Sequence, residues 1–590
     1  MAWWDRHPGE LRREIHALEA AGMQPQKNEE WFSKGKAIIH IRIEVLGKGR
    51  DAIISYPDLY PYFRPVLYVP GLDANLRHYN PCIGEICLLK RGTQYWLPNT
   101  TAAEHIQDML PRWEKAAVRA YDESRLEIED SQAEPVTVYY SAKETQRIAM
   151  DSSWQLPSGS RSGHIEIALP AGYKSIVPSG SDTAWVTGIE EDGKKNIKGI
   201  SLAEPLEKWI KTQGYEKCKF SWVRLDAPPF GRNESELAQI LISSSPQINS
   251  HIKREISLCK SGLYGFCFPE EAPDGGKRDG WLFVAYHYDH KMKRMGRNPD
   301  IWIIKPDYAG EKDLFERIPE LHPLRGKTIA VIGLGCVGAP SALALARAGI
   351  GELRFLDGDI VSAGTTCRWP LGLTAVGKEK VNKLAEFVSL NYPFTRIGTA
   401  HYPHGKKGCM VNIGAAGTDY DQWDCLDKLI EGIDLIYDAT AEQGINLMLN
   451  DLAIARKIPY ITVSSRAGGW GGNVVRVRPG RSEGCYLCYL HALQDKQIPQ
   501  PPYDPRGDSV QPIGCGNITF QAASFDVEEI ALSGVRMAVS TLCEGFTGTA
   551  YPPTVNDVAI LSLRKDGTAV FPEWQSSPLQ KHPQCGRCNQ

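Results

Sequence analysis

The stretch Lys327–Arg368, KTIAVIGLGCVGAPSALALARAGIGELRFLDGDIVSAGTTCR, decides the fold of the C-terminal part of this chain. Thr328–Ile332 is a short apolar run rich in β-branched residues, which predicts a strand buried on both faces of a parallel sheet. The glycine motif Gly333-x-Gly335-x-x-Gly338 ends that strand, and the apolar residues after it predict a helix. Leu353–Leu356 then predicts a second strand, so the stretch is expected to form a βαβ unit.

A βαβ opening of this kind is suited to bind the phosphates of a nucleotide. Glycines let the backbone approach a phosphate closely, and the helix N-terminus offers free N–H groups and a positive dipole end. Asp357, at the end of the second predicted strand, is placed to accept hydrogen bonds from ribose hydroxyls. By itself this fingerprint indicates a nucleotide site, with NAD or FAD as the first expectation.

The residues that follow change this expectation. Asp357-Gly-Asp359-Ile-Val, Thr365-Thr-Cys-Arg368 and Gly377-Lys-Glu-Lys380 succeed one another in an order that resembles the ThiF/MoeB family and the ubiquitin-activating enzymes. The resemblance covers residues 321–590. It implies a Rossmann-like α/β domain that uses ATP and Mg²⁺ to adenylate the C-terminal carboxylate of a protein, rather than to transfer hydride.

The same resemblance implies roles for individual residues. Asp357 and Asp359 are expected near the ribose and the metal, and Arg368 and Lys380 near the triphosphate. The chain departs from the family pattern twice. A threonine, Thr365 or Thr366, replaces the Asn ahead of the arginine. In addition, the D-x-x-D motif reads Asp438-Ala-Thr-Ala441-Glu442, without its second, magnesium-associated Asp. Either Asp438 or Glu442 takes that role, or the metal is held otherwise.

Composition sets the outer limits on the protein. The 590 residues are enough for three or four domains, and a net charge of −3 with 23% charged residues indicates neither a nucleic-acid partner nor an acidic membrane surface. No run of eighteen apolar residues is present, so we expect a cytoplasmic protein without a membrane contact. The fifteen cysteines are then expected to be reduced, and to serve as core residues, metal ligands or nucleophiles.

Residues 1–130 are expected to form an α+β domain. An amphipathic helix around Leu11–Ala21 precedes the alternating strand pattern Ala37–Val45, and a helix is expected from about Thr101. Between them stand Y-P-x-x-x-P, H-x-N, G-x-I-C-L and W-x-P motifs, in an order that resembles the ubiquitin-conjugating enzymes. In that family the cysteine of the G-x-I-C-L motif, here Cys87, carries a thioester.

The chemistry of a conjugating enzyme explains these residue types. A thiolate is a strong nucleophile, and its thioester keeps an acyl group reactive towards an amine. Asn80 is placed to donate an amide N–H to the oxyanion formed when the amine attacks, a contribution of ~3 kcal/mol in other acyl-transfer enzymes. A lone cysteine at a strand end is usually a small buried hydrophobe, and Cys82 is interpreted in that way.

Residues 131–320 are expected to form an α+β linker domain. Strand patterns at Pro135–Tyr140, Gly163–Leu169, Trp281–Tyr286 and Ile301–Ile304 alternate with helix patterns at 201–212 and 234–243. The run Tyr286-His-Tyr-Asp-His290 offers possible metal ligands, but no complementary cluster follows. We therefore expect a partly solvated strand end there.

Two cysteine pairs stand in the last third of the chain, Cys485-x-x-Cys488 and Cys585-x-x-Cys588. Two such knuckles in a reduced compartment favour one structural Zn²⁺ held by four thiolates. The long separation matches the placement of the zinc site in the ThiF/MoeB family. A redox role is the alternative for either pair taken alone.

Residues 494–512 are polar and rich in proline, and they resemble the loop that crosses over the acyl-adenylate in that family. Cys515 follows directly, and we expect it to be the activating cysteine, because a loop gives it mobility and solvent access. Cys543, in a helical run, is the rival and is more typical of core. Cys336, in the glycine motif, is interpreted as a small residue packed beneath the phosphates.

The combination resembles the activating–conjugating fusion proteins of bacterial CBASS anti-phage operons. That resemblance alone implies the partners: a cyclic-oligonucleotide synthase whose C-terminus is the acyl donor, an amine acceptor protein, and a second copy through the adenylation domain. An arginine such as Arg317 is considered for reaching the neighbouring copy's ATP. Two other functions stay open. One is a sulfur-carrier-protein adenylyltransferase of cofactor biosynthesis, and the other is a non-catalytic sensor in which Ala441 marks a decayed metal site.

Overall fold

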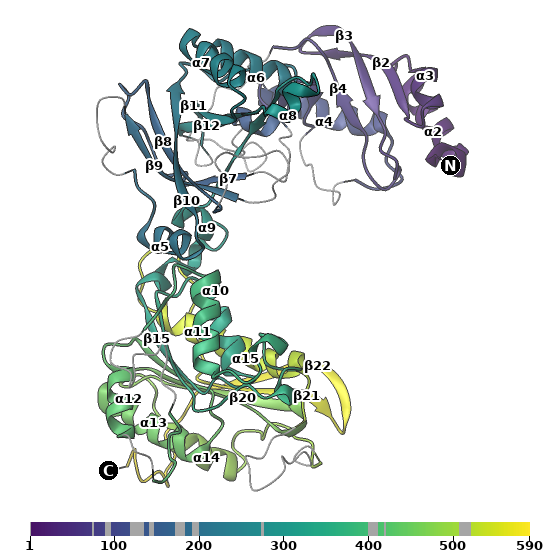
Figure 1. Ribbon diagram of the computed structural model, residues 1–590. Coiled ribbons are helices and arrows are strands. Elements are labelled where there is room, and N and C mark those ends of the chain that lie inside the picture. The colour runs from purple at the N-terminus through teal and green to yellow at the C-terminus, as the bar shows by residue number, and fades with distance from the viewer. Residues whose placement is uncertain are drawn as a thin grey trace. The chain divides into compact units, whose positions relative to one another are not determined.

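The computed structural model describes residues 2–73, 76–88, 96–117, 135–140, 147–171, 183–191, 200–272, 276–398, 411–417, 421–506 and 521–589. The chain divides into two compact units, one of Met1–Leu202 with Ile210–Gly310 and one of Ala203–Trp209 with Glu311–Gln590. Their elements are labelled in Figure 1. In the part of the chain that the structure describes, no helix is both long and apolar enough to cross a membrane.

The first sheet of the first unit is antiparallel throughout, in the strand order β1-β2-β3-β4-β6-β5. Its strands are β1 (Gln26–Lys27), β2 (Ile38–Val45), β3 (Lys48–Ser55), β4 (Val66–Tyr68), β5 (Tyr79–Asn80) and β6 (Glu85–Ile86). The helices beside it are α1 (Trp3–Arg6), α2 (Pro8–Ala20), α3 (Glu29–Ser33) and α4 (Ala102–Ala117). The alternation expected at Ala37–Val45 is present in β2, where Ile39, Ile41, Ile43 and Val45 are buried.

The second sheet has mixed pairing in the order β13-β12-β11-β10-β8-β9-β7-β14. Its strands are β7 (Arg147–Met150), β8 (Ser162–Leu169), β9 (Thr183–Glu191), β10 (Glu216–Arg224), β11 (Gly262–Glu271), β12 (Lys277–His287), β13 (Asp300–Ile304) and β14 (Pro306–Tyr308). Helices α5 (Glu204–Thr212), α6 (Glu234–Ser243), α7 (Pro246–Ser257) and α8 (His290–Arg294) lie along the same stretch of chain. The expectation of a mixed α+β segment agrees with this arrangement.

One strand expected in this segment is wrong. Pro135–Tyr140 was predicted as a strand from its β-branched residues, but Val136–Tyr139 form a 3-10 helix. The physical reason lies at the end of the run, where the buried Tyr140 exchanges hydrogen bonds with Gly231: its hydroxyl donates to the carbonyl (3.2 Å) and accepts from the N–H (2.9 Å). Strand propensity is weak, and this tertiary contact overrides it.

The second unit is built on a sheet in the order β17-β16-β15-β18-β19-β20-β21-β22, parallel from β17 to β19 and antiparallel from β19 to β22. The strands are β15 (Thr328–Ile332), β16 (Glu352–Leu356), β17 (Arg396–Ile397), β18 (Leu435–Asp438), β19 (Tyr460–Ser465), β20 (Gly471–Val477), β21 (Val558–Lys565) and β22 (Thr568–Ser577). The helices are α9 (Glu311–Phe315), α10 (Gly338–Arg347), α11 (Lys380–Asn391), α12 (Gln422–Ile430), α13 (Gln443–Arg456), α14 (Tyr486–Gln494) and α15 (Ser524–Leu542).

Both faces of this sheet are covered by helices, as Figure 1 shows. Alternate residues of β15 enter two different cores: Ile329 and Val331 pack with residues of α10, α11 and α15, whereas Ala330 and Ile332 pack with residues of α12, α13 and α14. A strand buried on both faces needs a continuous apolar sequence, which is why Thr328–Ile332 lacks polar alternation. The predicted doubly covered α/β domain is therefore present, and β15 leads straight into the glycine motif.

Candidate nucleotide and transfer sites

The loop between β15 and α10 has no room for side chains at two of its three glycines. Gly333 has a φ of +83°, and a Cβ there would lie 2.9 Å from the carbonyl atoms of Ala439 and the amide of Thr440. A Cβ on Gly338 would collide with the Gly333 carbonyl oxygen. A Cβ on Gly335 would meet no protein atom within 4 Å, so this position opens outward. The loop packs on the chain after β18 and presents its middle to a ligand.

Asp357 ties the end of β16 to this loop. Its carboxylate accepts hydrogen bonds from the backbone N–H groups of Leu334 (2.6 Å) and Asp359 (2.7 Å). Lys380, the first residue of α11, donates to Asp359 Oδ2 at 2.7 Å and lies 3.9 Å from Asp357 Oδ1. Burial raises the pKa of Asp357, while the Lys380 charge opposes that rise. Both predicted carboxylates and the predicted lysine therefore meet beside the glycine loop.

The turn that carries Arg368 is tied to the glycine loop by the next residue, Trp369. The indole N–H of Trp369 donates to the Leu334 carbonyl at 2.9 Å, which fastens the turn that carries Arg368 to the glycine loop. Burial raises the pKa of the Cys336 thiol, and the nearby charges of Arg368 and Lys380 oppose that rise. Lys380 and Arg368 thus place positive charge near Cys336 of the loop, and such charge favours a polyphosphate. Sequence reasoning missed Trp369, because its spacing from the glycine motif carries no local signal.

Asp438 lies at the end of β18 and is completely buried. Its Oδ1 accepts from the Thr440 N–H (3.0 Å) and hydroxyl (2.8 Å), and its Oδ2 accepts from Asn446 Nδ2 and the Tyr460 hydroxyl, both at 2.7 Å. Burial raises the pKa of this carboxyl, and the four hydrogen bonds oppose the rise. These donors hold Asp438 within the protein, where it braces the segment that packs on Gly333.

Ala441 and Glu442, which follow in the chain, differ in what they can offer a metal ion. Ala441 has a φ of +55° and supplies no ligand atom. Glu442 is exposed at the N-cap of α13, where its Oε1 accepts a long hydrogen bond from the Gly444 N–H at 3.4 Å. Of the two candidates for the missing magnesium carboxylate, Glu442 is the one whose oxygens are open to solvent, as Mg²⁺ with its retained waters requires.

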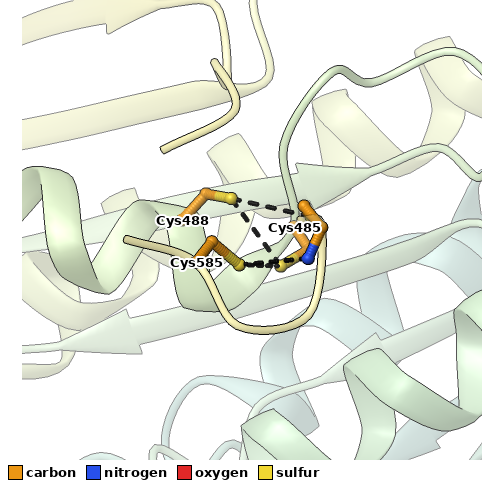
Figure 2. A group of neighbouring side chains, drawn as sticks. Cys485, Cys488 and Cys585 are labelled. Carbon is orange, nitrogen blue, oxygen red and sulfur yellow. Dashed lines mark hydrogen bonds between the residues drawn. The ribbon is translucent and has the colours of Figure 1, made fainter. Parts of the chain in front are cut away.

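The four predicted knuckle cysteines come together although the two pairs are about a hundred positions apart, and Figure 2 shows three of them, Cys485, Cys488 and Cys585. The Sγ atoms of Cys485 lie 3.9 Å from Cys488 and 3.6 Å from Cys585, and those of Cys488 and Cys588 lie 3.7 Å apart. A tetrahedral Zn²⁺ with bonds of about 2.3 Å separates its sulfurs by about 3.8 Å. The donor set and its spacing therefore fit Zn²⁺. No other group of this kind occurs among the described residues, the His287–His290 run included.

In the first unit, Cys87 directly follows β6 and is partly exposed. Its N–H donates to the His78 carbonyl at 2.8 Å. Tyr79 pairs with Ile86 and Asn80 pairs with Glu85. Because Tyr79 and Ile86 are buried and strand side chains alternate, Asn80 and Cys87 share the opposite face of this hairpin. The two predicted transfer residues are thus on one face of one hairpin.

Of the two candidates for the activating cysteine, Cys543 lies within the described residues and Cys515 does not. Cys515 and residues 507–512 of the predicted crossover loop lie outside the described residues. Cys543 caps the C-terminal end of α15 and is 3% exposed, so the structure places it in the core, as expected for the rival. Arg317, considered for an intersubunit contact, is exposed.

Comparison with known proteins finds a family match within the second unit. The ThiF family model matches residues 313–558. Two Sinorhizobium fredii proteins named as uncharacterized are similar over most of the chain. Protein y4qC is 29% identical, covering 90% of this chain and 88% of its own length, and y4oA is 25% identical, covering 99% and 97%. The similarity to these two proteins thus extends well beyond the ThiF segment.

Two characterised proteins are similar to less than half of the chain. The adenylyltransferase and sulfurtransferase UBA4 of Yarrowia lipolytica is 24% identical, over 45% of this chain and 56% of that enzyme. The crystal structure of E. coli MccB with ATP is 17% identical with a TM-score of 0.32, over 45% of this chain and 68% of that one. The segment that carries the glycine loop and its surrounding charges thus lies within the residues, 313–558, that match the model of the ThiF family.

Proposed function

We propose that this chain activates the C-terminal carboxylate of a partner protein with ATP and passes the acyl group through two cysteines to an amine. The observation that carries the proposal is the meeting of Asp357, Lys380 and Arg368 at the glycine loop of a ThiF-family domain. A carboxylate oxygen of the partner attacks the α-phosphorus, the bond to the β-phosphate oxygen breaks, and pyrophosphate leaves. The product is an acyl-adenylate.

Within this proposal each residue has a defined task. Asp357 accepts from the ribose, the open middle of the glycine loop receives the phosphates, and Lys380 and Arg368 balance their charge. Mg²⁺, when bound with the nucleotide, neutralises charge on the leaving pyrophosphate. Glu442 is the side chain that we assign to the metal, because Asp438 is enclosed by four donors.

The later steps use thiol chemistry. The Cys515 thiolate attacks the acyl carbon and AMP leaves. The Cys87 thiolate then attacks that thioester and frees the Cys515 thiol, and finally an amine attacks the Cys87 thioester to form an amide. Asn80 donates to the oxyanion of this last step. The exposure of Cys87 and its shared hairpin face with Asn80 support this part.

The first experiment is ATP–pyrophosphate exchange with the partner protein. We expect exchange that requires the partner's C-terminal residue. D357A and R368A should abolish it, because they remove contacts to the nucleotide, whereas C515A and C87A should retain it. Exchange that does not depend on the partner's C-terminus, or hydride transfer with NAD or FAD in the same pocket, would refute the adenylation proposal.

The order of the cysteines is tested by trapping the acyl group. C87A should accumulate an adduct on Cys515 that a thiol reductant removes, and C515A should leave both sites empty. Mixing the two variants restores product only if transfer runs between chains. If C515A still charges Cys87 at the wild-type rate, Cys515 is not the activating cysteine, and Cys543 or direct attack by Cys87 replaces it.

A second function is favoured by the similarity to UBA4, whose name includes sulfur transfer. A sulfur-carrier adenylyltransferase would also perform exchange but would not need Cys87. Normal modification of the partner by C87A would therefore select this alternative. From the resemblance to CBASS fusion proteins we propose a cyclic-oligonucleotide synthase as the acyl donor, a cytoplasmic location, and a homodimer through the adenylation domain.

A further inference from the structure

The hairpin that carries Cys87 is joined to the second sheet of the same unit by an ion pair. Arg77, which precedes the hairpin, places its Nη1 2.6 Å from Oε1 of Glu271, the last residue of β11. The two side chains are only 12% and 19% exposed. They are 194 positions apart in the sequence, so this contact exists only because the two sheets meet here.

A second attachment lies at the turn of the hairpin. Cys82 packs against an apolar core that belongs to the second sheet and its helices, including Tyr140 and Phe266. Burial in these surroundings raises the pKa of the Cys82 thiol. Cys82 therefore belongs to the core of the neighbouring sheet, although its own backbone belongs to the first.

Hydrogen bonds connect the two attachments, the Arg77–Glu271 ion pair and the Cys82 contact, to other residues of the Cys87 hairpin. The Asn80 side chain accepts from the Cys82 N–H at 3.0 Å, which couples the turn to the strand that faces Cys87. The His78 carbonyl, next to Arg77, accepts from the Cys87 N–H and from the indole of Trp113, each at 2.8 Å. Movement at Arg77 would therefore reach the Cys87 backbone through His78, and movement at Cys82 would reach Asn80 on the paired strand.

We propose that the second sheet is a clamp that positions the Cys87 hairpin, with Arg77 and Glu271 as the main positioning pair and Cys82 as the second anchor. The functional meaning of this clamp rests on the proposed transfer role of Cys87. A thioester carrier must present one face of its thiol to the incoming acyl group, and a hairpin held at both ends loses the freedom to turn that face away. The predicted linker domain, residues 131–320, which contains this second sheet, then positions the Cys87 hairpin and is not a passive linker.

The test measures the thiol directly and needs neither ATP nor a partner. The full-length chain is treated with iodoacetamide, and the alkylation rates of the Cys87 and Cys367 peptides are followed by mass spectrometry. Cys367 is exposed in the other unit and serves as the internal reference. R77Q or E271Q should raise the Cys87 rate about tenfold relative to Cys367, which corresponds to ~1.4 kcal/mol of easier opening.

Three further variants make the result specific. The exchanged pair R77E/E271R should bring the Cys87 rate back towards wild type, and C82A should raise it less than R77Q does. The matched control D51N breaks the exposed Arg42–Asp51 pair of the same first sheet and should leave the rate unchanged. Equal Cys87 rates in wild type, R77Q and E271Q, or an increase of the same size in D51N, would overturn the clamp. Loss of pyrophosphate exchange in wild type would count against the proposed function and leave this result standing.

Discussion

Replacement of one cysteine of the predicted zinc cluster should destabilise the second unit, and the geometry sets the scale of the effect. The four Sγ atoms are grouped within 4.8 Å of one another, at spacings that match a tetrahedral ion without rearrangement. Cys585 and Cys588 come from the chain end, whereas Cys485 and Cys488 stand at the start of α14. C588S therefore removes the link that holds the chain end on the domain.

The magnitude follows from two contributions. If free Zn²⁺ exceeds its dissociation constant a thousandfold, binding stabilises the folded domain by about 4 kcal/mol. Release of the chain end would also expose Leu579, which is 2% exposed and contributes about 2 kcal/mol by its burial. At about 2–4 °C of melting temperature per kcal/mol for a domain of this size, the loss of ~4–6 kcal/mol should lower the transition by about 8–24 °C.

Elemental analysis and calorimetry test this reasoning. Freshly purified wild type should contain one zinc per chain, and C588S or deletion of the last six residues should lower both the zinc content and the melting temperature. C367S, which alters an exposed cysteine of the same unit, should change neither. A wild-type chain without zinc, or a C588S melting temperature equal to that of C367S, would refute the assignment.

Three further predictions concern other sites. E442Q should raise the Mg²⁺ concentration needed for ATP binding about tenfold in calorimetric titrations. The control D421N, which alters a capping carboxylate at the start of α12, should leave that concentration unchanged. An unchanged Mg²⁺ requirement in E442Q would contradict our choice of Glu442 as the ligand. G333A should abolish ATP binding in the same titrations, because its Cβ would meet the backbone of Ala439 and Thr440; wild-type affinity would argue against the loop. Burial raises the pKa of the Glu14 carboxyl above its usual 4.5, so this group loses its proton at lower pH in the unfolded chain than in the folded one. The free energy of unfolding should therefore fall as pH rises from 4.5 through the folded pKa, and urea unfolding of E14Q should lack this pH dependence. An unchanged pH dependence in E14Q would assign the effect to another group.

Local sequence patterns were enough to predict the βαβ unit at the start of the ThiF-family match. The apolar run Thr328–Ile332, the glycine motif and the second strand appear where expected, because a strand buried on both faces and a backbone turn at φ +83° each demand particular residue types. Asp357 was also predictable from its place at the end of the second strand, whereas Lys380 was expected only from the resemblance to the ThiF/MoeB family. Pattern reasoning failed at Pro135–Tyr140, where a distant contact outweighed strand propensity.

Contacts between distant parts of the chain were beyond such patterns. The sequence alone left three possibilities for the metal: Asp438, Glu442 or some other group. Only the fold decides that Asp438 is enclosed, because its donors Asn446 and Tyr460 come from a helix and from the neighbouring strand.

Cys82 and Cys87 illustrate the same division within a single hairpin. The sequence by itself determined that Cys87 stands in a motif suited to acyl transfer, and it favoured a structural role for Cys82. Only the tertiary structure decided that Cys82, which is partly buried, packs against the core of another sheet, and that Arg77 is paired with Glu271. The physical reason is that strand and turn propensities depend on neighbours a few positions away, whereas a salt bridge or a shared core depends on which surfaces meet after the chain has folded.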